Sequence, residues 1–473
     1  MKNSINIKTD IYTYLSTERT VRDILFQLAV GIYIVFAHLD CTMYGGMSIF
    51  TRVSDILKMV SMLLMLANAF INIRRFSLKQ IILLGIFSII AVMSALKCGS
   101  LAAVLMVIFW SGVGDTEFDD ILRIFLFSSC FCLALSVISC LVGLVPNYVH
   151  ITGGSSIGYS HPTSLAVSYL SIVLCYLGLR KEKIAWYEMV CLFAIEIVFY
   201  LIEKNSGALI AVIIALIIDL IIKCFSGKVV STILTVTGTV ITAGMFCLSL
   251  AASTIADFNK PIWNYLNSWV SGRIGLNQQA LNNPGISLLG QHMEWTQDIG
   301  IYNYIDSSYL KLIVMYGLLF TVLIISMYTI WGYRAGKKKL LFAELILIVI
   351  AIHSLVEDTI TNIYFNPISI AVGSILFEKK NEESNRLFTN FKTIIDEIRN
   401  KRLFAIIGCI VITIVLIIKT VNQGYMFYKV DWFTETFNPV KTVVVSCIIG
   451  TISGILLVGS VIAGIYILKE KRK

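Results

Sequence analysis

Arg273 is the residue of this chain whose chemistry is easiest to state from the sequence. It follows Ser271-Gly272 in a polar, aromatic-rich segment, residues 252–306, that interrupts an otherwise apolar chain. A guanidinium binds a phosphate or diphosphate through two parallel hydrogen bonds, so a lone arginine in a segment poor in carboxylates suits that ligand. The alternative is a surface ion pair with Glu294 or Asp298.

A histidine and a carboxylate four residues apart form a second candidate group. His353 and Glu357 would share one helix face, where they could act as an acid–base pair. A structural hydrogen bond is the alternative role. Glu196 and Glu203 add two carboxylates to the predicted outer half of another apolar segment, where polar groups are costly.

An uncharged glycine- and serine-rich stretch, residues 151–163, contains His161 and Pro162. Pro162 suits the first turn of a helix, and the free backbone amides of that helix start could accept an anion. The spacing by itself favours an ordinary glycine-rich turn. We keep both interpretations.

The elements that carry these residues are membrane spans. The chain has 473 residues, of which 57% are hydrophobic and 14% charged, and its mean hydropathy of +0.82 excludes an ordinary soluble domain. Because a span needs about 20 apolar residues, we expect an all-α polytopic membrane protein with about fourteen transmembrane helices. The predicted spans are 21–39, 53–73, 79–96, 98–113, 121–145, 164–179, 185–202, 206–222, 229–251, 307–331, 340–358, 361–377, 403–419 and 441–468.

Loop charges predict the orientation of these spans. Lys and Arg concentrate in the loops that we assign to the cytoplasm, such as Arg74-Arg75 and Lys337-Lys338-Lys339. Both termini are then cytoplasmic, and no cleavable signal precedes the first span, which stays as an anchor. The net charge of +9 follows from this topology, with anionic membrane lipid as the partner and no role for nucleic acid.

The same assignment predicts how the chain is divided. The expected parts are an N-terminal transmembrane bundle at 1–251, one large extracellular loop at 252–306, further transmembrane helices at 307–377, a basic cytoplasmic linker at 378–402, and a C-terminal transmembrane pair at 403–473. The linker is either a helix on the inner leaflet or a solvated connector. The eleven cysteines show no metal-ligand spacing, so we expect neither a metal nor another cofactor.

Four short segments, taken together, resemble the Gram-positive branch of the Wzy polysaccharide polymerases, in the O-antigen ligase and polymerase superfamily. They are Gly158-Tyr159-Ser160-His161-Pro162, Ser271-Gly272-Arg273 through Leu289-Gly290-Gln291, Asp306-Ser307-Ser308-Tyr309-Leu310, and His353 through Glu357 to Asn366-Pro367. The chain departs from the family where an arginine commonly precedes the glycine-aromatic stretch and an asparagine follows it. A second arginine is also absent after Ser206.

The resemblance implies a GT-C-like membrane glycosyltransferase in a bacterial cell membrane. Such an enzyme joins undecaprenyl-diphosphate-linked oligosaccharides, as donor and as acceptor, on the outer face by inverting transfer without a metal. It works with a flippase and a chain-length regulator. The roles implied here are catalytic for Arg273, Asp306, Glu357 and His353, and substrate-binding for His161, Gly158, Tyr159, Gln291 and Tyr309, with Lys204 or Lys260 in place of the absent arginine.

Arg273 would stabilise the departing diphosphate, and Asp306, Glu357 or His353 would be the base. Two alternatives remain open. A polymer ligase of the same superfamily would use a similar sequence. A lipid-linked oligosaccharide flippase would show matching halves and short loops on both sides, which this chain lacks.

Overall fold

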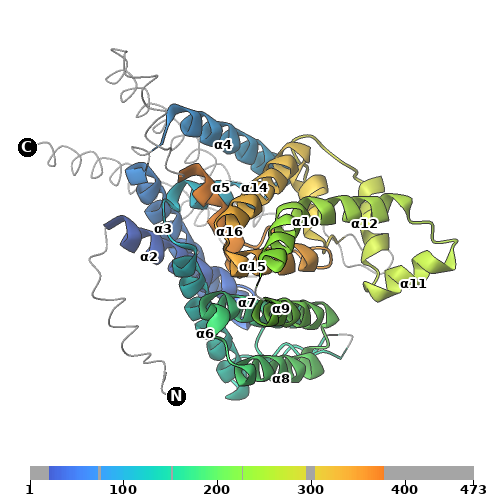
Figure 1. Cartoon of the computed structure of the whole chain (residues 1–473). Coiled ribbons are helices and arrows are strands. Elements are labelled where there is room, and N and C mark those ends of the chain that lie inside the picture. Colours follow the sequence, from blue (N-terminus) through green and yellow to red (C-terminus); the bar gives the residue numbers. More distant parts are fainter. Residues whose placement is uncertain (1–20, 73–75, 151–152, 226, 294–303, 378–473) are drawn as a thin grey trace, which may run out of the picture.

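The protein is an all-helical, polytopic membrane protein. The computed structural model describes residues 21–72, 76–150, 153–225, 227–293 and 304–377, and in these ranges the regular elements are helices without a strand (Figure 1). Eight of the described helices are long and apolar enough to cross a membrane. The linker 378–402 and the predicted spans 403–419 and 441–468 lie outside the described residues.

Most predicted spans in the described ranges correspond to one helix each, within a few residues. The eight long helices are α2 (Val21–Leu39), α3 (Ser48–Asn72), α4 (Leu78–Cys98), α6 (Phe118–Leu141), α7 (Pro162–Arg180), α9 (Ser206–Cys224), α10 (Lys228–Ile255) and α14 (Leu318–Lys337). Two further predicted spans correspond to α5 (Ala102–Gly112) and α8 (Trp186–Glu203).

Local signals in the sequence set several of these helix boundaries. The Ser77 side chain and Gln80 form a capping box at the start of α4, and Gly99 ends that helix in the left-handed conformation at φ 74°. Asn205 caps α9 by accepting from the amides of Gly207 and Ala208. At the start of α7, His161 is the cap, and Pro162 is the first helical residue, which confirms the predicted first-turn position of the proline.

The predicted span 307–331 is not one helix. It consists of α13 (Ser308–Lys311), a π-helical turn (Leu312–Tyr316) and α14, with a break at Gly317, whose φ is 91°. A β-carbon on Gly317 would lie 2.2 Å from the backbone nitrogen of Gly290. The break therefore leaves space for the backbone of Gly290 to approach Gly317, a contact that hydropathy could not reveal.

The predicted span 340–358 is also shorter than expected, because α15 (Leu341–His353) ends five residues early. The predicted span 361–377 consists of three short helices, Ile363–Phe365, α16 (Pro367–Ala371) and Val372–Phe377. The predicted loop 252–306 begins later, since α10 extends to Ile255, and it contains α11 (Pro261–Trp269) and α12 (Arg273–Asn282). Figure 1 shows α11 and α12 standing out from one side of the helix bundle.

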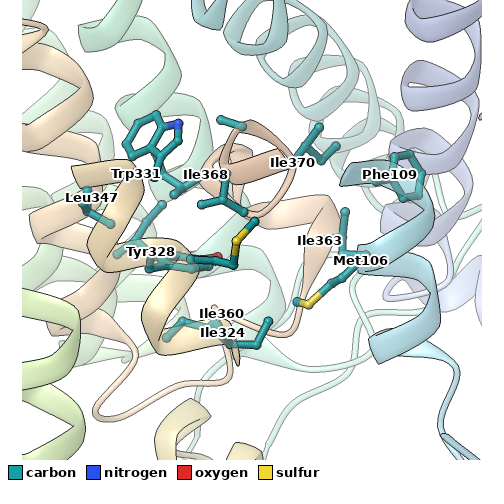
Figure 2. Close-up of a cluster of buried hydrophobic side chains, with 14 of the residues drawn as sticks. Met106, Phe109, Ile324, Tyr328, Trp331, Leu347, Ile360, Ile363, Ile368 and Ile370 are labelled. Carbon is teal, nitrogen blue, oxygen red and sulfur yellow. The ribbon is translucent and has the colours of Figure 1, made fainter. Parts of the chain in front are cut away.

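A buried apolar core fixes the short helices after α15. Tyr328 and Trp331 of α14 pack with Ile363 and Ile368, all at most 6% exposed (Figure 2). The indole of Trp110 on α5 donates to the carbonyl of Ser369 at 2.6 Å. Residues 354–362 thus connect α15 to this packed core.

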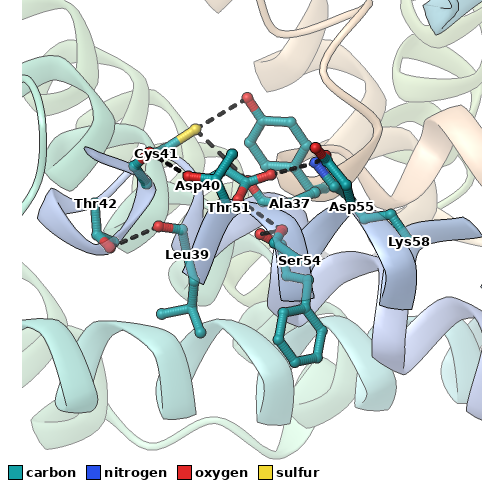
Figure 3. A network of polar contacts seen from close by, with 12 residues as sticks. Ala37, Leu39, Asp40, Cys41, Thr42, Thr51, Ser54, Asp55 and Lys58 are labelled. Atoms are coloured by element: carbon teal, nitrogen blue, oxygen red, sulfur yellow. Dashed lines mark hydrogen bonds and ion pairs between the residues drawn. The ribbon is translucent and has the colours of Figure 1, made fainter. Parts of the chain in front are cut away.

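A polar network ties the same region to the N-terminal helices (Figure 3). Asp40, after α2, accepts from Ser54 at 2.6 Å and pairs with Lys58 of α3 at 2.5 Å. The thiol of the neighbouring Cys41 contacts the Tyr364 hydroxyl at 3.2 Å. Partial burial of the two charged groups, Asp40 and Lys58, is tolerated because they pair with each other.

Candidate functional site

Arg273 lies at the centre of a group of charged side chains from three separate loops. Its Nη2 is 2.7 Å from Oε1 of Glu357 and 3.5 Å from Oδ2 of Asp306. Its Nε donates to the carbonyl of Val356. The three charged side chains are 13% to 22% exposed, so they are partly shielded from water and still reachable.

Each member is positioned by the end of a helix. Ser271 and Gly272, with φ of 54° and 83°, turn the chain so that Arg273 begins α12. Asp306 precedes the first residue of α13 by two positions, and Glu357 follows the end of α15 by four residues. Helices α10 and α15 end, and α14 begins, at the same end of the bundle, and we call this end the "loop end".

Ser308 joins two of these loops. Its hydroxyl donates to the carbonyl of Glu357 at 2.9 Å and accepts from the amide of Thr359 at 2.8 Å. Its own amide donates to the carbonyl of Ser354 at 3.0 Å. Asp306 and Glu357 are therefore set relative to each other by backbone contacts and do not depend on their side chains to meet.

A second ion pair adjoins the first. Lys311 Nζ is 2.6 Å from Oδ2 of Asp358. Lys311 and Asp358 also act on Asp306, the cation lowering and the carboxylate raising the pKa of that carboxyl. The Arg273 cluster, defined as Arg273, Lys311, Asp306, Glu357 and Asp358, thus contains three carboxyl groups and two permanent cations.

The proton balance of this cluster is unusual. Burial, and then the neighbouring Asp306 and Asp358, raise the pKa of Glu357 to about 8, although Arg273 opposes the rise. Burial also raises the pKa of Asp306, again against the effect of Arg273. With three acids and two cations, one carboxyl can hold a proton near neutral pH. Glu357 is the acid whose pKa suits binding and release of that proton.

Basic groups extend from Arg273 along the loop end. The ring of His161 lies against that of His150, with centroids 4.9 Å apart. Loss of hydration, and then His150 and Arg273, lower the pKa of His161, so its imidazole is neutral near pH 7. Its Nδ1 accepts from the amide of Thr163 at 3.2 Å, which assigns the remaining proton to Nε2 as a donor.

Lys204 joins this row from the end of α8. It has a left-handed conformation, at φ 60°, and its Nζ is 3.0 Å from the position of a β-carbon on Gly153. The amide of Gly153 donates to the carbonyl of His150 at 2.8 Å. Lys260, the other lysine considered from the sequence, is exposed and lies 3.8 Å from Asp257. Lys204 is thus the lysine whose contacts connect it to the segment that carries His150 and His161, which we call the histidine loop.

The predicted pairing of His353 with Glu357 is wrong. The α-helix ends at His353, and although the amide of Glu357 still donates to the carbonyl of His353 at 3.0 Å, the two side chains do not pair. His353 is 2% exposed and its Nδ1 contacts the Thr359 hydroxyl at 2.8 Å, whereas Glu357 pairs with Arg273. The predicted ion pairs of Arg273 with Glu294 and Asp298 fall outside the described residues.

Three residues predicted to bind substrate have structural contacts. Tyr159 is fully buried, with its hydroxyl 3.0 Å from Nε2 of His38. Tyr309 is fully buried and donates to the carbonyl of Ala351 at 2.8 Å. Gln291 uses its side-chain amide to bind the carbonyls of Gly285 and Val314, at 2.6 and 3.1 Å. All three hold the loops that carry the charged groups.

Gly158 has a similar supporting position. Its φ is 83°, and a β-carbon there would lie 2.5 Å from the carbonyl oxygen of Ser136. Its own carbonyl accepts from the amide of Met43 at 2.8 Å. Glycine is therefore required at this position for the histidine loop to approach α6.

Sequence reasoning missed the pair of Lys311 with Asp358 and the contribution of His150. One signal was available, since a lysine at the start of an apolar helix requires a counter-ion. Among the described residues, no group of three or more His, Cys, Asp or Glu side chains could hold a metal ion. Comparison of the chain with protein-family models, with curated proteins and with solved structures finds no match.

Proposed function

We propose that the protein is a polysaccharide polymerase. It joins undecaprenyl-diphosphate-linked oligosaccharide repeats at the outer membrane face, with the Arg273 cluster as its reaction centre. The observation that carries the proposal is the meeting of a guanidinium with two partly shielded carboxyl groups, Asp306 and Glu357, beside a row of basic side chains. A phosphate leaving group needs the cation, and an attacking hydroxyl needs the base.

In this reaction the acceptor hydroxyl attacks the anomeric carbon of the donor sugar. A new carbon–oxygen bond forms, and the bond from that carbon to the lipid diphosphate breaks with inversion. Glu357 in its ionised form takes the hydroxyl proton, and its pKa of about 8 suits a base that must be partly ionised at neutral pH. The diphosphate departs with the bonding electron pair, and negative charge grows on its oxygens.

Arg273 is suited to that growing charge. Its Nη1 makes one long contact, 3.4 Å to the carbonyl of Val270, so this nitrogen can turn to a phosphate oxygen. Nε2 of His161 and Nζ of Lys204 would bind the same diphosphate from the adjoining loops. Lys204 would then provide the basic contact that the family takes from an arginine.

The test is synthesis by the purified protein in liposomes supplied with undecaprenyl-diphosphate oligosaccharide and a chelator. We expect a ladder of longer lipid-linked chains. Transfer to an added lipid-core or wall-polymer acceptor, without a ladder, would indicate a ligase. Movement of the substrate between leaflets without any new bond would indicate a flippase.

A further inference from the structure

A carboxylic acid lies inside the helix bundle, outside the Arg273 cluster, and has no hydrogen-bond partner in the described part of the chain. Glu344 is the fourth residue of α15 and is fully buried. Neither of its carboxyl oxygens has a hydrogen-bond partner among the described residues. An isolated ionised carboxylate in such surroundings costs several kcal/mol or more, so the group needs a cation or a proton.

The neighbouring helix is shaped around this side chain. A β-carbon on Gly238 of α10 would lie 1.4 Å from Oε2 of Glu344, so the glycine leaves the space that the carboxyl group fills. Thr242, one turn further along α10, is also fully buried, and its hydroxyl has no partner among the described residues. Gly332 of α14 packs against the same turn, since its β-carbon would lie 2.4 Å from the Gly238 carbonyl oxygen.

The charged groups on the surrounding helices do not neutralise Glu344. Helix α15 packs against α7, α9, α10 and α14. Towards the same end of the bundle, these four helices carry Arg180, Asp219, Lys223, Lys228, Arg334 and Lys337. In the described part of the chain, none of these side chains forms an ion pair or a hydrogen bond with Glu344. An alkali cation would need more oxygen ligands than Glu344 and Thr242 supply, because helix carbonyls are already bonded within the helix.

We propose that Glu344 is a proton-binding site, and that its proton stabilises the arrangement of the loop end. Helices α10, α14 and α15 meet at Glu344, and the same three helices lead into the loops that carry Arg273, Asp306 and Glu357. From Glu344 to the end of α15 is roughly 14 Å at 1.5 Å per residue. Loss of the proton would leave a negative charge on Glu344 where α10, α14 and α15 pack together. This charge would push the three helices apart and loosen the loops that carry Arg273, Asp306 and Glu357. The proposal does not depend on the proposed reaction.

The first experiment compares the native chain with Glu344→Gln, which has the shape of the protonated acid but cannot ionise. A single cysteine replaces Ser354, a fully buried residue whose carbonyl accepts from the amide of Ser308, in a background without native cysteines. Its maleimide labelling rate is divided by that of a cysteine at the exposed Asn282, which corrects for thiol ionisation at each pH.

Between pH 6 and pH 9 we expect the corrected labelling rate to rise about tenfold more with Glu344 than with Glu344→Gln. Glu357 titrates in the same range, so the difference between the two chains is the readout. Equal pH dependence in both chains would overturn the proposal. Protection restored at pH 9 by sodium, but not by choline, would also overturn it, in favour of an alkali-cation site.

A second measurement needs no cysteine. The thermal unfolding midpoints of the native chain and Glu344→Gln should agree at pH 6 and diverge by pH 9, where the native chain becomes the less stable. Gly238→Ala should lower the midpoint strongly with Glu344 present and much less with Glu344→Ala, because the β-carbon would collide with the carboxyl group. If the two substitutions lower the midpoint additively, Gly238 is not required to make space for the Glu344 carboxyl group. A lower midpoint of Glu344→Gln at every pH would show that the ionised form is the native one.

Discussion

Removal of the Asp306 charge should change the pH at which Glu357 releases its proton. Oxygens of both side chains lie near Nη2 of Arg273, at 3.5 and 2.7 Å, so these two oxygens are at most about 6 Å apart. At an effective dielectric constant of about 20, two negative charges at that distance repel by roughly 3 kcal/mol. Because Arg273 screens the pair, about 1 to 2 kcal/mol is the expected effect, or a 5- to 30-fold change in proton affinity.

Asp306→Asn should therefore lower the pKa of Glu357 from its value of about 8. The assay is the initial rate of chain extension in liposomes from pH 5.5 to 9.5. The rising limb of the native profile should lie near pH 8, and in Asp306→Asn it should move to lower pH. The matched control is Asp257→Asn, because Asp257 is a half-exposed carboxylate near the start of the same segment, paired with Lys260.

Two results would refute this reasoning. If the rising limb of the pH–rate profile lies at the same pH in Asp306→Asn as in the native chain, the two carboxyl groups do not titrate together. Full polymer length from both Asp306→Asn and Glu357→Gln would mean that neither is the base. The role would then pass to His161 or to a hydroxyl that no side chain activates.

Three further predictions concern the same region. Arg273→Ala should abolish chain extension, and Arg273→Lys should remain impaired at least 100-fold, because lysine keeps the charge but loses the planar fork; near-normal extension by Arg273→Ala would make the arginine structural. Glu357 binds its proton more tightly in the folded state than at its ordinary pKa of 4.5, so its contribution to stability is full below that pH and is lost as the pH rises through about 8. Thermal unfolding of Glu357→Gln should lack this decline, and an identical decline would contradict the assignment. An impermeant thiol reagent added outside cells should label a cysteine at position 283 and spare one at 385, and the reverse pattern would invert the predicted topology.

The sequence by itself determined that this is a helical membrane protein and where most of its described helices lie. Length and hydropathy suffice for that, because a helix that crosses a bilayer is long and apolar and bonds its backbone groups internally. Local signals in the sequence fixed individual boundaries, as at the cap Ser77 and at Pro162, the first residue of its helix. The residue types of Arg273, Asp306 and Glu357 marked them as candidates before any contact was known.

The tertiary structure decided which of these residues meet. The spacing of His353 and Glu357 predicted a pair, but the helix ends between them and Glu357 turns to Arg273, 84 positions away in the sequence. The break at Gly317, where the backbone of Gly290 approaches, and the pKa of Glu357, which burial and Asp306 raise, likewise depend on neighbours from other segments. Hydropathy and spacing report the short-range preferences of the chain. Ion pairing, burial and the lack of space for a β-carbon at Gly238 arise between segments that meet only on folding.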